Sequence, residues 1–182
     1  DQKTGPDGCL YVLDWYDRYH CYQDANRDPQ GIDRLKGRLY RVRYQETPRA
    51  GQFDLAQESD AQLIERLDSP NVYFRETAQR ILAERNTLEL VQQLSQLVTA
   101  ADTPAKQRRH ALFALMACDL LRHDQDWQIP KRLSQSDDPL LRAWAVRCLG
   151  VHALRFLRTP ESTENHELMV AEYVTAALED ES

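Results

Sequence analysis

The chain has 182 residues, a formal net charge of -6 at pH 7 and an isoelectric point near 5.4. Its lysines and arginines are scattered at helical intervals, and an acidic chain of this kind is a poor partner for a nucleic-acid backbone. We therefore expect no nucleic-acid binding. No window approaches the roughly 18 apolar residues of a membrane span, so we expect no transmembrane segment. The chain starts at Asp1 without an initiator methionine or an apolar leader, which suggests a fragment of a longer protein.

Residues 1–44 have the composition of a β-structure. Residues 5–8 (Gly-Pro-Asp-Gly) are a turn signature, because proline presets φ and glycine tolerates positive φ. Residues 9–16 are rich in β-branched and aromatic side chains, and residues 37–44 alternate basic with apolar ones. We predict that these two runs pair as strands on either side of the polar stretch 17–36. Because two strands cannot form a stable domain alone, the pair is predicted to be a β-hairpin remnant of a larger sheet.

The pattern changes after residues 45–57, which contain Pro48 and Gly51 and are predicted to be a linker. From residue 58 onward the hydrophobic period is 3.6 and an internal repeat appears. Three series of identical residues recur at spacings of 33 and 34: Arg75, Arg108 and Arg142; Ala78, Ala111 and Ala145; Leu82, Leu115 and Leu149. This coincidence predicts one structural unit that is repeated along the chain.

Each repeat is predicted to be a helical hairpin. Shorter amphipathic stretches, the predicted first helices, lie at residues 63–67, 90–98 and 129–133. Proline-containing breakers follow them at residues 69–71, 102–104 and 137–139. An Asp or Ser before the proline is expected to cap the second helix, because proline costs nothing in a first turn.

One hairpin cannot bury its own apolar stripe, so neighbouring hairpins are expected to stack. The predicted fold class is therefore mainly α, a HEAT-like α-solenoid over residues 58–182. It would hold about three hairpins, and residues 164–180 are predicted to open a fourth.

The four cysteines are Cys9, Cys21, Cys118 and Cys148. They form no C-x-x-C pair and no C-x-x-C-H haem attachment motif, so no cofactor is expected in this chain. Cys9 and Cys21 could pair in an oxidising compartment. Cys118 and Cys148 are predicted to be buried on apolar helix faces.

In the order of its motifs the chain resembles the membrane-bound dehydrogenases of the PVC haem-binding type, relatives of sorbosone and quinoprotein glucose dehydrogenases. The motifs that carry the resemblance are residues 5–8, 10–12, 14–17, His20, 27–29, 33–34, the Gly-Arg-Leu-Tyr-Arg-Val strand at 37–42, and the first repeat at 69–71 and 74–80. The resemblance is close over residues 5–85. Beyond residue 85 the chain resembles the family only in having helical repeats. In that family a six-bladed β-propeller is followed by HEAT-like repeats, so residues 1–44 are expected to be the C-terminal blade segment of a propeller.

The resemblance implies a periplasmic or cell-surface oxidoreductase that passes electrons to a c-type haem domain, with a quinone or calcium in the parent protein. This chain lacks C-x-x-C-H and most of the blades, so we expect a non-catalytic fragment whose repeats link the two domains. Its expected partners are the rest of its propeller and the haem domain. The alternative is a HEAT-repeat scaffold that binds a protein partner and is attached to a non-enzymatic propeller.

The densest polar constellation in the sequence lies between residues 14 and 33. Its candidate metal ligands are Asp14, Asp24, Asn26 and Asp28. A calcium loop starting at Asp24 fails at its sixth position, Pro29, and at its twelfth, Leu35. The alternative is that these side chains cap turns and pair with neighbouring arginines.

Two residues of the same stretch are catalytic candidates. His20 could act as a base because imidazole titrates near neutrality, and Asp17 lies close to it in sequence. The alternative is a packed or hydrogen-bonded surface histidine. The remaining histidines, His110, His123, His152 and His166, have no partner at ligand spacing and are predicted to be structural. Trp127 and Trp144 are predicted to pack between repeats.

Overall fold

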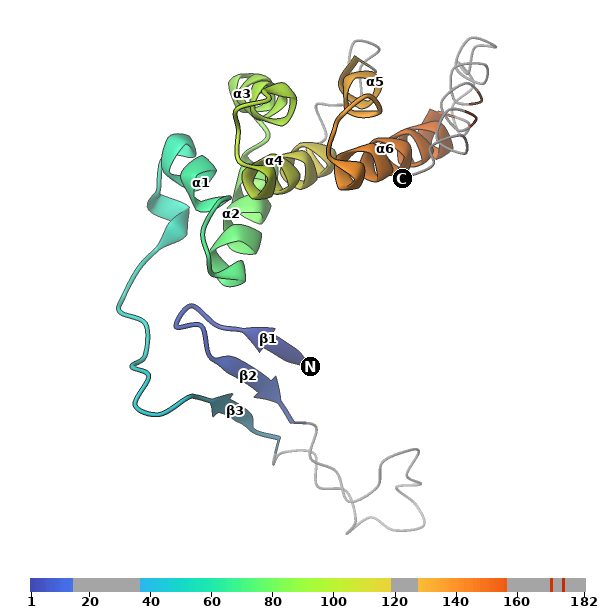
Figure 1. The fold of residues 1–182 in the computed structure, drawn as a ribbon. Coiled ribbons are helices and arrows are strands. Elements are labelled where there is room, and N and C mark those ends of the chain that lie inside the picture. The colour runs from blue at the N-terminus through green and yellow to red at the C-terminus, as the bar shows by residue number, and fades with distance from the viewer. Residues whose placement is uncertain (15–36, 119–127, 157–170, 172–174, 176–182) are drawn as a thin grey trace, which may run out of the picture. The chain divides into compact units, whose positions relative to one another are not determined.

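The computed structural model describes residues 1–14, 37–118 and 128–156, together with residues 171 and 175. The polar stretch 17–36 and Trp127 therefore lie outside the described residues, as does the predicted opening helix 164–180 of a fourth hairpin apart from residues 171 and 175. The described part is mainly helical with a small antiparallel sheet, as predicted (Figure 1).

The chain divides into two compact units. Unit 1 comprises Asp1–Asp54 and Pro70–Phe74, and unit 2 comprises Leu55–Ser69 and Arg75–Ser182. Unit 2 thus begins inside the segment 45–57 that the sequence predicts as a linker.

Unit 1 contains a three-stranded antiparallel sheet in the order β1 (Gln2–Thr4), β2 (Leu10–Leu13), β3 (Leu39–Val42). The predicted pairing of the second and third strands is confirmed, with Leu10 opposite Val42 and Leu13 opposite Leu39. A third strand was not predicted: β1 pairs with the other edge of β2. The Gln-Lys-Thr sequence of β1 has no apolar alternation, so its strand depends on the backbone ladder alone.

Several large apolar side chains of the sheet region face solvent. Leu13, Leu39 and Val42 are 57%, 65% and 56% exposed, and Tyr44 is 79% exposed. Both β1 and β3 are edge strands among the residues that the structure describes.

The turn between β1 and β2 is formed by the Gly-Pro-Asp-Gly sequence, as predicted. The Gly8 N–H donates to the Gly5 carbonyl at 3.0 Å, and the Gly5 N–H donates to the Cys9 carbonyl at 2.8 Å. Gly8 has a φ of 75°, a conformation that glycine adopts without steric cost. Pro6 presets the φ of the second turn position. The three-residue loop with its left-handed last residue is a common hairpin connection.

Gly5 is required for a different reason, because the ring of Tyr11 packs against its backbone. A Cβ atom on Gly5 would lie 2.6 Å from Cδ2 of Tyr11. We expect Gly5→Ala to lower the free energy of unfolding of unit 1 by about 1–3 kcal/mol, the cost of overpacking. Chemical denaturation followed by tyrosine fluorescence measures this loss.

Gly51→Ala is the matched control for this substitution. Gly51 has nothing within 4 Å of its Cβ position, so alanine there is expected to leave the denaturation midpoint unchanged. Equal effects of the two substitutions would contradict the packing of Tyr11 on Gly5.

Six α-helices occur in the described part of the chain, in three successive pairs: α1 (Asp60–Arg66) and α2 (Val72–Arg85), α3 (Leu88–Thr99) and α4 (Ala105–Ala117), α5 (Gln128–Leu133) and α6 (Pro139–Phe156). A short 3-10 helix, η2 (Leu55–Gln57), precedes α1. The predicted breakers separate the two helices of each pair. In Figure 1 the helices α1, α3 and α5 form one row and α2, α4 and α6 form a second.

The repeated apolar residues lie inside the helical core. Ala78, Ala111 and Ala145 have no exposed surface, and Leu82 and Leu115 are equally buried. The side chain of Leu149 lies outside the described residues. The small alanine side chain allows neighbouring helices to approach closely, while the leucine four residues later fills the same face.

The repeated arginine has a role that its spacing alone did not reveal. Arg75 donates from Nη1 to the Ser69 carbonyl at 2.5 Å, and Arg142 donates from Nη1 to the Ser136 carbonyl at 2.8 Å. Arg108 donates from Nε to the Val98 carbonyl at 3.3 Å. The last carbonyls of a helix have no partner within that helix. In each pair, therefore, an arginine in the second helix donates a hydrogen bond to a backbone carbonyl at or just after the end of the first helix.

Removing this contact in the third pair is expected to destabilise it. Arg142→Met keeps the apolar stem but loses the charged donor, and Arg142 is only half-buried, so we expect a loss of about 1.5 kcal/mol. Denaturant unfolding measures the loss. Arg80→Met is the control, since Arg80 is 63% exposed and, within the described ranges, forms its ion pair with Glu84 on its own helix. A larger effect at Arg80 than at Arg142 would refute the role of the repeated arginine.

The predicted capping of the second helices is confirmed only for α6. There Pro139 is the first helical residue and Asp138 Oδ1 accepts from the Leu140 N–H at 2.9 Å. For α2 the prediction is wrong, because Asn71 after the proline accepts from the Tyr73 N–H at 3.0 Å. For α4 it is also wrong, since Pro104 occupies the cap position and provides no side-chain hydrogen bond. Capping by the residue before proline requires proline at the first helical position, which only α6 satisfies.

Candidate functional site

Of the predicted metal ligands, only Asp14 is among the described residues. It follows β2, and its N–H donates to the Arg38 carbonyl at 2.8 Å, which extends the pairing of β2 with β3. The other candidates lie outside the described residues: Asp17, His20, Asp24, Asn26 and Asp28. No group of three or more His, Cys, Asp or Glu side chains in the described ranges is placed to hold a metal ion. The catalytic and metal sites therefore stay predictions from sequence.

The described cysteines are packing residues. Cys9, Cys118 and Cys148 are buried, and the Cys118 thiol donates to the Ala114 carbonyl at 3.3 Å. Burial raises the pKa of the Cys148 thiol to about 12, so it stays protonated and unreactive at neutral pH. The predicted burial of Cys118 and Cys148 is confirmed. Cys21, the partner considered for Cys9, lies outside the described residues.

Among the described residues of unit 1, a polar cluster is centred on Asp7 in the turn; we call Asp7, Tyr11 and Arg41 the Asp7 cluster. Asp7 Oδ2 accepts from Arg41 Nε at 2.6 Å and from the Tyr11 hydroxyl at 3.0 Å. Asp7 Oδ1 accepts from the Cys9 N–H at 3.0 Å. The Asp7 side chain is 2% exposed. Burial raises the pKa of Asp7, but these hydrogen bonds outweigh it, so its pKa lies below the usual 3.8.

The Asp7 cluster also holds the chain that follows β3. The Arg41 Nη2 group donates to the carbonyls of Thr47 and Pro48, both at 2.8 Å. The hydrogen bond between Asp7 and Arg41 therefore joins the Gly-Pro-Asp-Gly turn to the Gly-Arg-Leu-Tyr-Arg-Val strand, two motifs that stand apart in the sequence. All of its carboxylate and guanidinium hydrogen bonds are internal to unit 1, so it has the character of a structural cluster and not of a catalytic site.

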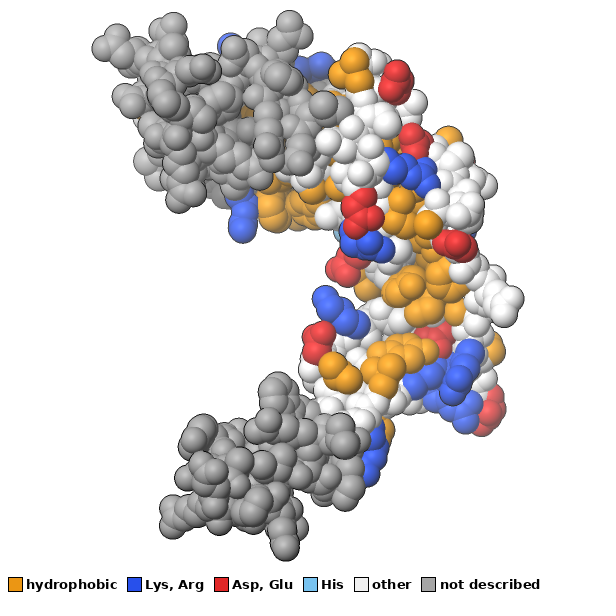
Figure 2. Space-filling view, turned by 180° about the vertical axis from the view of Figure 1, so that it is seen from behind, with side chains coloured by type: hydrophobic (Ala, Val, Ile, Leu, Met, Phe, Trp, Pro, Cys, Tyr) orange, Lys and Arg blue, Asp and Glu red, His pale blue; other side chains and the backbone are white. Residues whose placement is uncertain are grey.

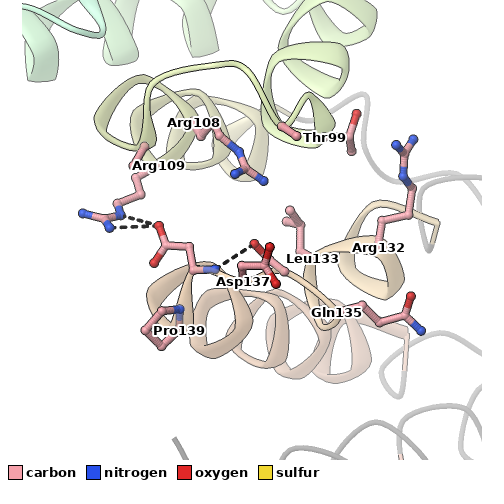
Figure 3. Close-up of a pocket in the computed structure, with 12 residues that line it drawn as sticks. Thr99, Arg108, Arg109, Arg132, Leu133, Gln135, Asp137 and Pro139 are labelled. Carbon is pink, nitrogen blue, oxygen red and sulfur yellow. Dashed lines mark hydrogen bonds and ion pairs between the residues drawn. The ribbon is translucent and has the colours of Figure 1, made fainter.

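The candidate binding site of unit 2 is a hollow of about 690 Å³, which we call the inter-hairpin hollow (Figure 3). It lies between the turn of the α3–α4 pair and the turn of the α5–α6 pair. Its charged lining residues are Arg108, Arg109, Arg132, Asp137 and Asp138, and Leu133 forms part of its floor. Sequence reasoning missed this site, because its walls come from two turns that are separated by about one repeat.

One ion pair closes one side of the hollow. Arg109 donates to Asp138 Oδ2 from Nη2 at 2.8 Å and from Nε at 3.1 Å, as Figure 3 shows. The Asp138 side chain is 12% exposed. Burial raises the pKa of Asp138, but the hydrogen bonds from Arg109 and from the start of α6 outweigh it, so the pKa lies below 3.8. Asp138 thus joins α4 to α6 while it also caps α6.

The other charged side chains of the hollow differ in whether they already make hydrogen bonds. Arg108 is engaged through Nε with the Val98 carbonyl. Arg132 and Asp137 are exposed, and neither side chain is hydrogen-bonded or ion-paired to the part of the chain that the structure describes. The lining residues include no histidine or cysteine. The hollow therefore presents an exposed guanidinium, that of Arg132, and an exposed carboxylate, that of Asp137.

The second helices of the three pairs contact one another through aromatic and basic side chains. The rings of Phe113 and Trp144 lie 4.6 Å apart between α4 and α6, and Arg147 lies 5.0 Å above Trp144. The predicted packing role of Trp144 is thus confirmed. His110 of α4 contacts Arg75 and Gln79 of α2. His110 is thus part of the packing between α2 and α4.

The described surface carries charges of both signs. On the face shown in Figure 2, Lys and Arg side chains alternate with Asp and Glu, and hydrophobic side chains lie between them. No helix in the described ranges is long and apolar enough to cross a membrane.

Comparison with known protein families, with curated proteins and with solved structures finds no match to this chain.

Proposed function

We propose that this chain is a non-catalytic linker in which a HEAT-type stack of helical hairpins follows the last blade segment of a six-bladed β-propeller. The observation that carries the proposal is the repeated arginine contact. Arg75 and Arg142, two repeats apart, each donate to a serine carbonyl six residues earlier. The agreement of these two contacts supports a chain built from one repeated unit, and repeated units of this kind are stabilised by stacking on their neighbours.

The resemblance to the membrane-bound dehydrogenases supports the setting of this linker. In that setting the repeats join a propeller dehydrogenase domain to a c-type haem domain, in the periplasm or at the cell surface. A quinone or calcium would belong to the propeller of the parent protein. The residues of this chain do not fit a c-type haem, since the sequence holds no C-x-x-C-H and the described cysteines are buried far apart in sequence.

The linker proposal is tested in the parent reading frame beyond Ser182. A C-x-x-C-H motif within the next few hundred residues is the expected result. Further repeats without that motif would instead favour the alternative, a HEAT-repeat scaffold for a protein partner on a non-enzymatic propeller. The inter-hairpin hollow, with its exposed Arg132, is the observation that favours this alternative.

The stacking itself is tested by truncation within the purified chain. Stopping the chain after residue 118 removes α5 and α6 but leaves the first two helix pairs. In a solenoid each repeat contacts only its neighbours, so the shortened chain is expected to keep its helical circular dichroism per remaining helical residue. A single globular core would instead lose its helices when a third of it is removed. An absorbance spectrum of the full chain is expected to show no chromophore.

A further inference from the structure

One histidine joins the second helices of the first and second pairs, beside a separate hydrogen bond from Gln107 of α4 to the Ile64 carbonyl of α1. Arg75 of α2 donates from Nε to His110 Nε2 on α4 at 3.1 Å. The other ring nitrogen, Nδ1, lies 3.2 Å from Gln79 Oε1 of α2. Because Nε2 must accept from a guanidinium, the proton of the neutral ring belongs on Nδ1, which donates to Gln79. The ring is held edge-on to Phe113, with centroids 5.6 Å apart.

We propose that His110 is a pH-sensitive joint, which links α2 to α4 while its imidazole is neutral and releases them when the imidazole is protonated. A protonated ring has no acceptor. Its Nε2–H would face the Nε–H of Arg75 at hydrogen-bond distance, so a hydrogen bond would become a contact between two cations. Arg75 keeps its hydrogen bond to the Ser69 carbonyl, and α2 does not need to unfold for the joint to open.

The charged groups around the ring favour the neutral form. Burial lowers the pKa of His110 below its usual 6.5, and the positive charges of Arg75 on α2 and Lys106 on α4 lower it further. Glu76 on α2 acts in the opposite direction but does not outweigh them. The joint is therefore closed at neutral pH.

The direction of the pH effect follows from linkage. Once the joint opens, His110 returns to an ordinary pKa near 6.5, so the open form binds a proton more readily than the closed form. Closing is fully favoured above pH 6.5, and this contribution is lost as the pH falls from there toward the lower pKa of the closed form. Within that window, opening is expected to increase by up to about tenfold per pH unit.

Hydrogen exchange of the intact chain at pH 7.5 and pH 5.5, corrected for intrinsic exchange rates, tests the joint. The amides of α2 and of the first turns of α4 are expected to lose protection at pH 5.5. Those at the α5–α6 contact serve as the internal reference for general acid destabilisation. His110→Gln keeps a donor and an acceptor but does not titrate, and in this variant the α2 and α4 protection is expected to be equal at the two pH values.

Two results would overturn the proposal. One is an equal loss of protection in the wild type and in His110→Gln. The other is an NMR titration in which His110 has a pKa at or above 6.5 in the folded chain. If His110→Gln does not fold, the same NMR titration in the wild type still decides, because the joint requires a depressed pKa.

Discussion

Ala145→Asp is expected to unfold the third helix pair. Ala145 has no exposed surface and lies in α6 at the position that Ala78 and Ala111 occupy in the earlier pairs. An aspartate there would be a buried charge without a partner, in a space that fits a methyl group. We expect a loss of at least about 4 kcal/mol in the free energy of unfolding, because burial of an unpaired charge and overpacking add together. Helical circular dichroism and the thermal midpoint measure it.

The same helix provides the control for this experiment. Ala143 lies two residues earlier in α6 and is exposed. Ala143→Asp introduces the same side chain into the same helix, at a cost of about 0.5 kcal/mol from helix propensity. An unchanged midpoint in Ala145→Asp, or equal losses in the two variants, would show that the repeat register is wrong.

Asp7→Ala is expected to have the largest effect in unit 1. The substitution leaves the guanidinium of Arg41, whose side chain is 16% exposed, without its carboxylate. It also removes the acceptor of the Tyr11 hydroxyl and of the Cys9 N–H. Removing one partner of a buried ion pair is costly because the other charge is left buried without a counter-charge. We expect the amides of β2 and β3 to lose most of their protection in hydrogen exchange.

Glu46→Ala removes a carboxylate from a different arginine and is the control. Glu46 is 92% exposed and pairs with Arg43, so its loss is expected to leave the sheet intact. Adding Arg41→Met to Asp7→Ala removes the stranded charge and is expected to restore part of the lost protection. If the double variant is as unprotected as the sum of the single ones, the two side chains are not coupled.

The Asp7 cluster also has a defined pH dependence. The pKa of Asp7 in the folded chain lies below 3.8, so its contribution to stability is fully present above that value and is lost as the pH falls through the lower, folded pKa. Acid unfolding of the sheet in the wild type is expected to have a component below pH 3.8 that Asp7→Ala lacks.

The helical half of the fold could be predicted because its information is local and repeated. Breakers at regular intervals, and alanine and leucine at fixed offsets, indicate where helices begin, end and pack. Strand β1 could not be predicted in this way, since Gln2, Lys3 and Thr4 carry no pattern. Residues 2–4 form a strand because the turn that follows folds them back against the edge of β2 that β3 does not occupy.

The side-chain contacts within each unit were harder to predict than the helices and strands themselves. Asp7 and Arg41 are 34 residues apart, and only the register of β2 with β3 brings them together. The repeated arginines were visible, but their acceptors are backbone carbonyls, which leave no mark in the sequence. His110 and Arg75 are 35 residues apart, about one repeat, so the period predicts that their helices are neighbours but not that these two side chains meet.

The sheet of unit 1 also has a practical consequence for handling the protein. Its edge strand β3 carries exposed leucine, tyrosine and valine side chains, and the outer backbone edge of β3 is unpaired within the described residues. A short apolar strand with an open edge is a template for pairing with another chain. Unit 1 produced by itself is therefore a source of aggregates at high concentration. Expression of any shortened form should keep β3 covered, or place lysine at Leu39, where the side chain already faces solvent.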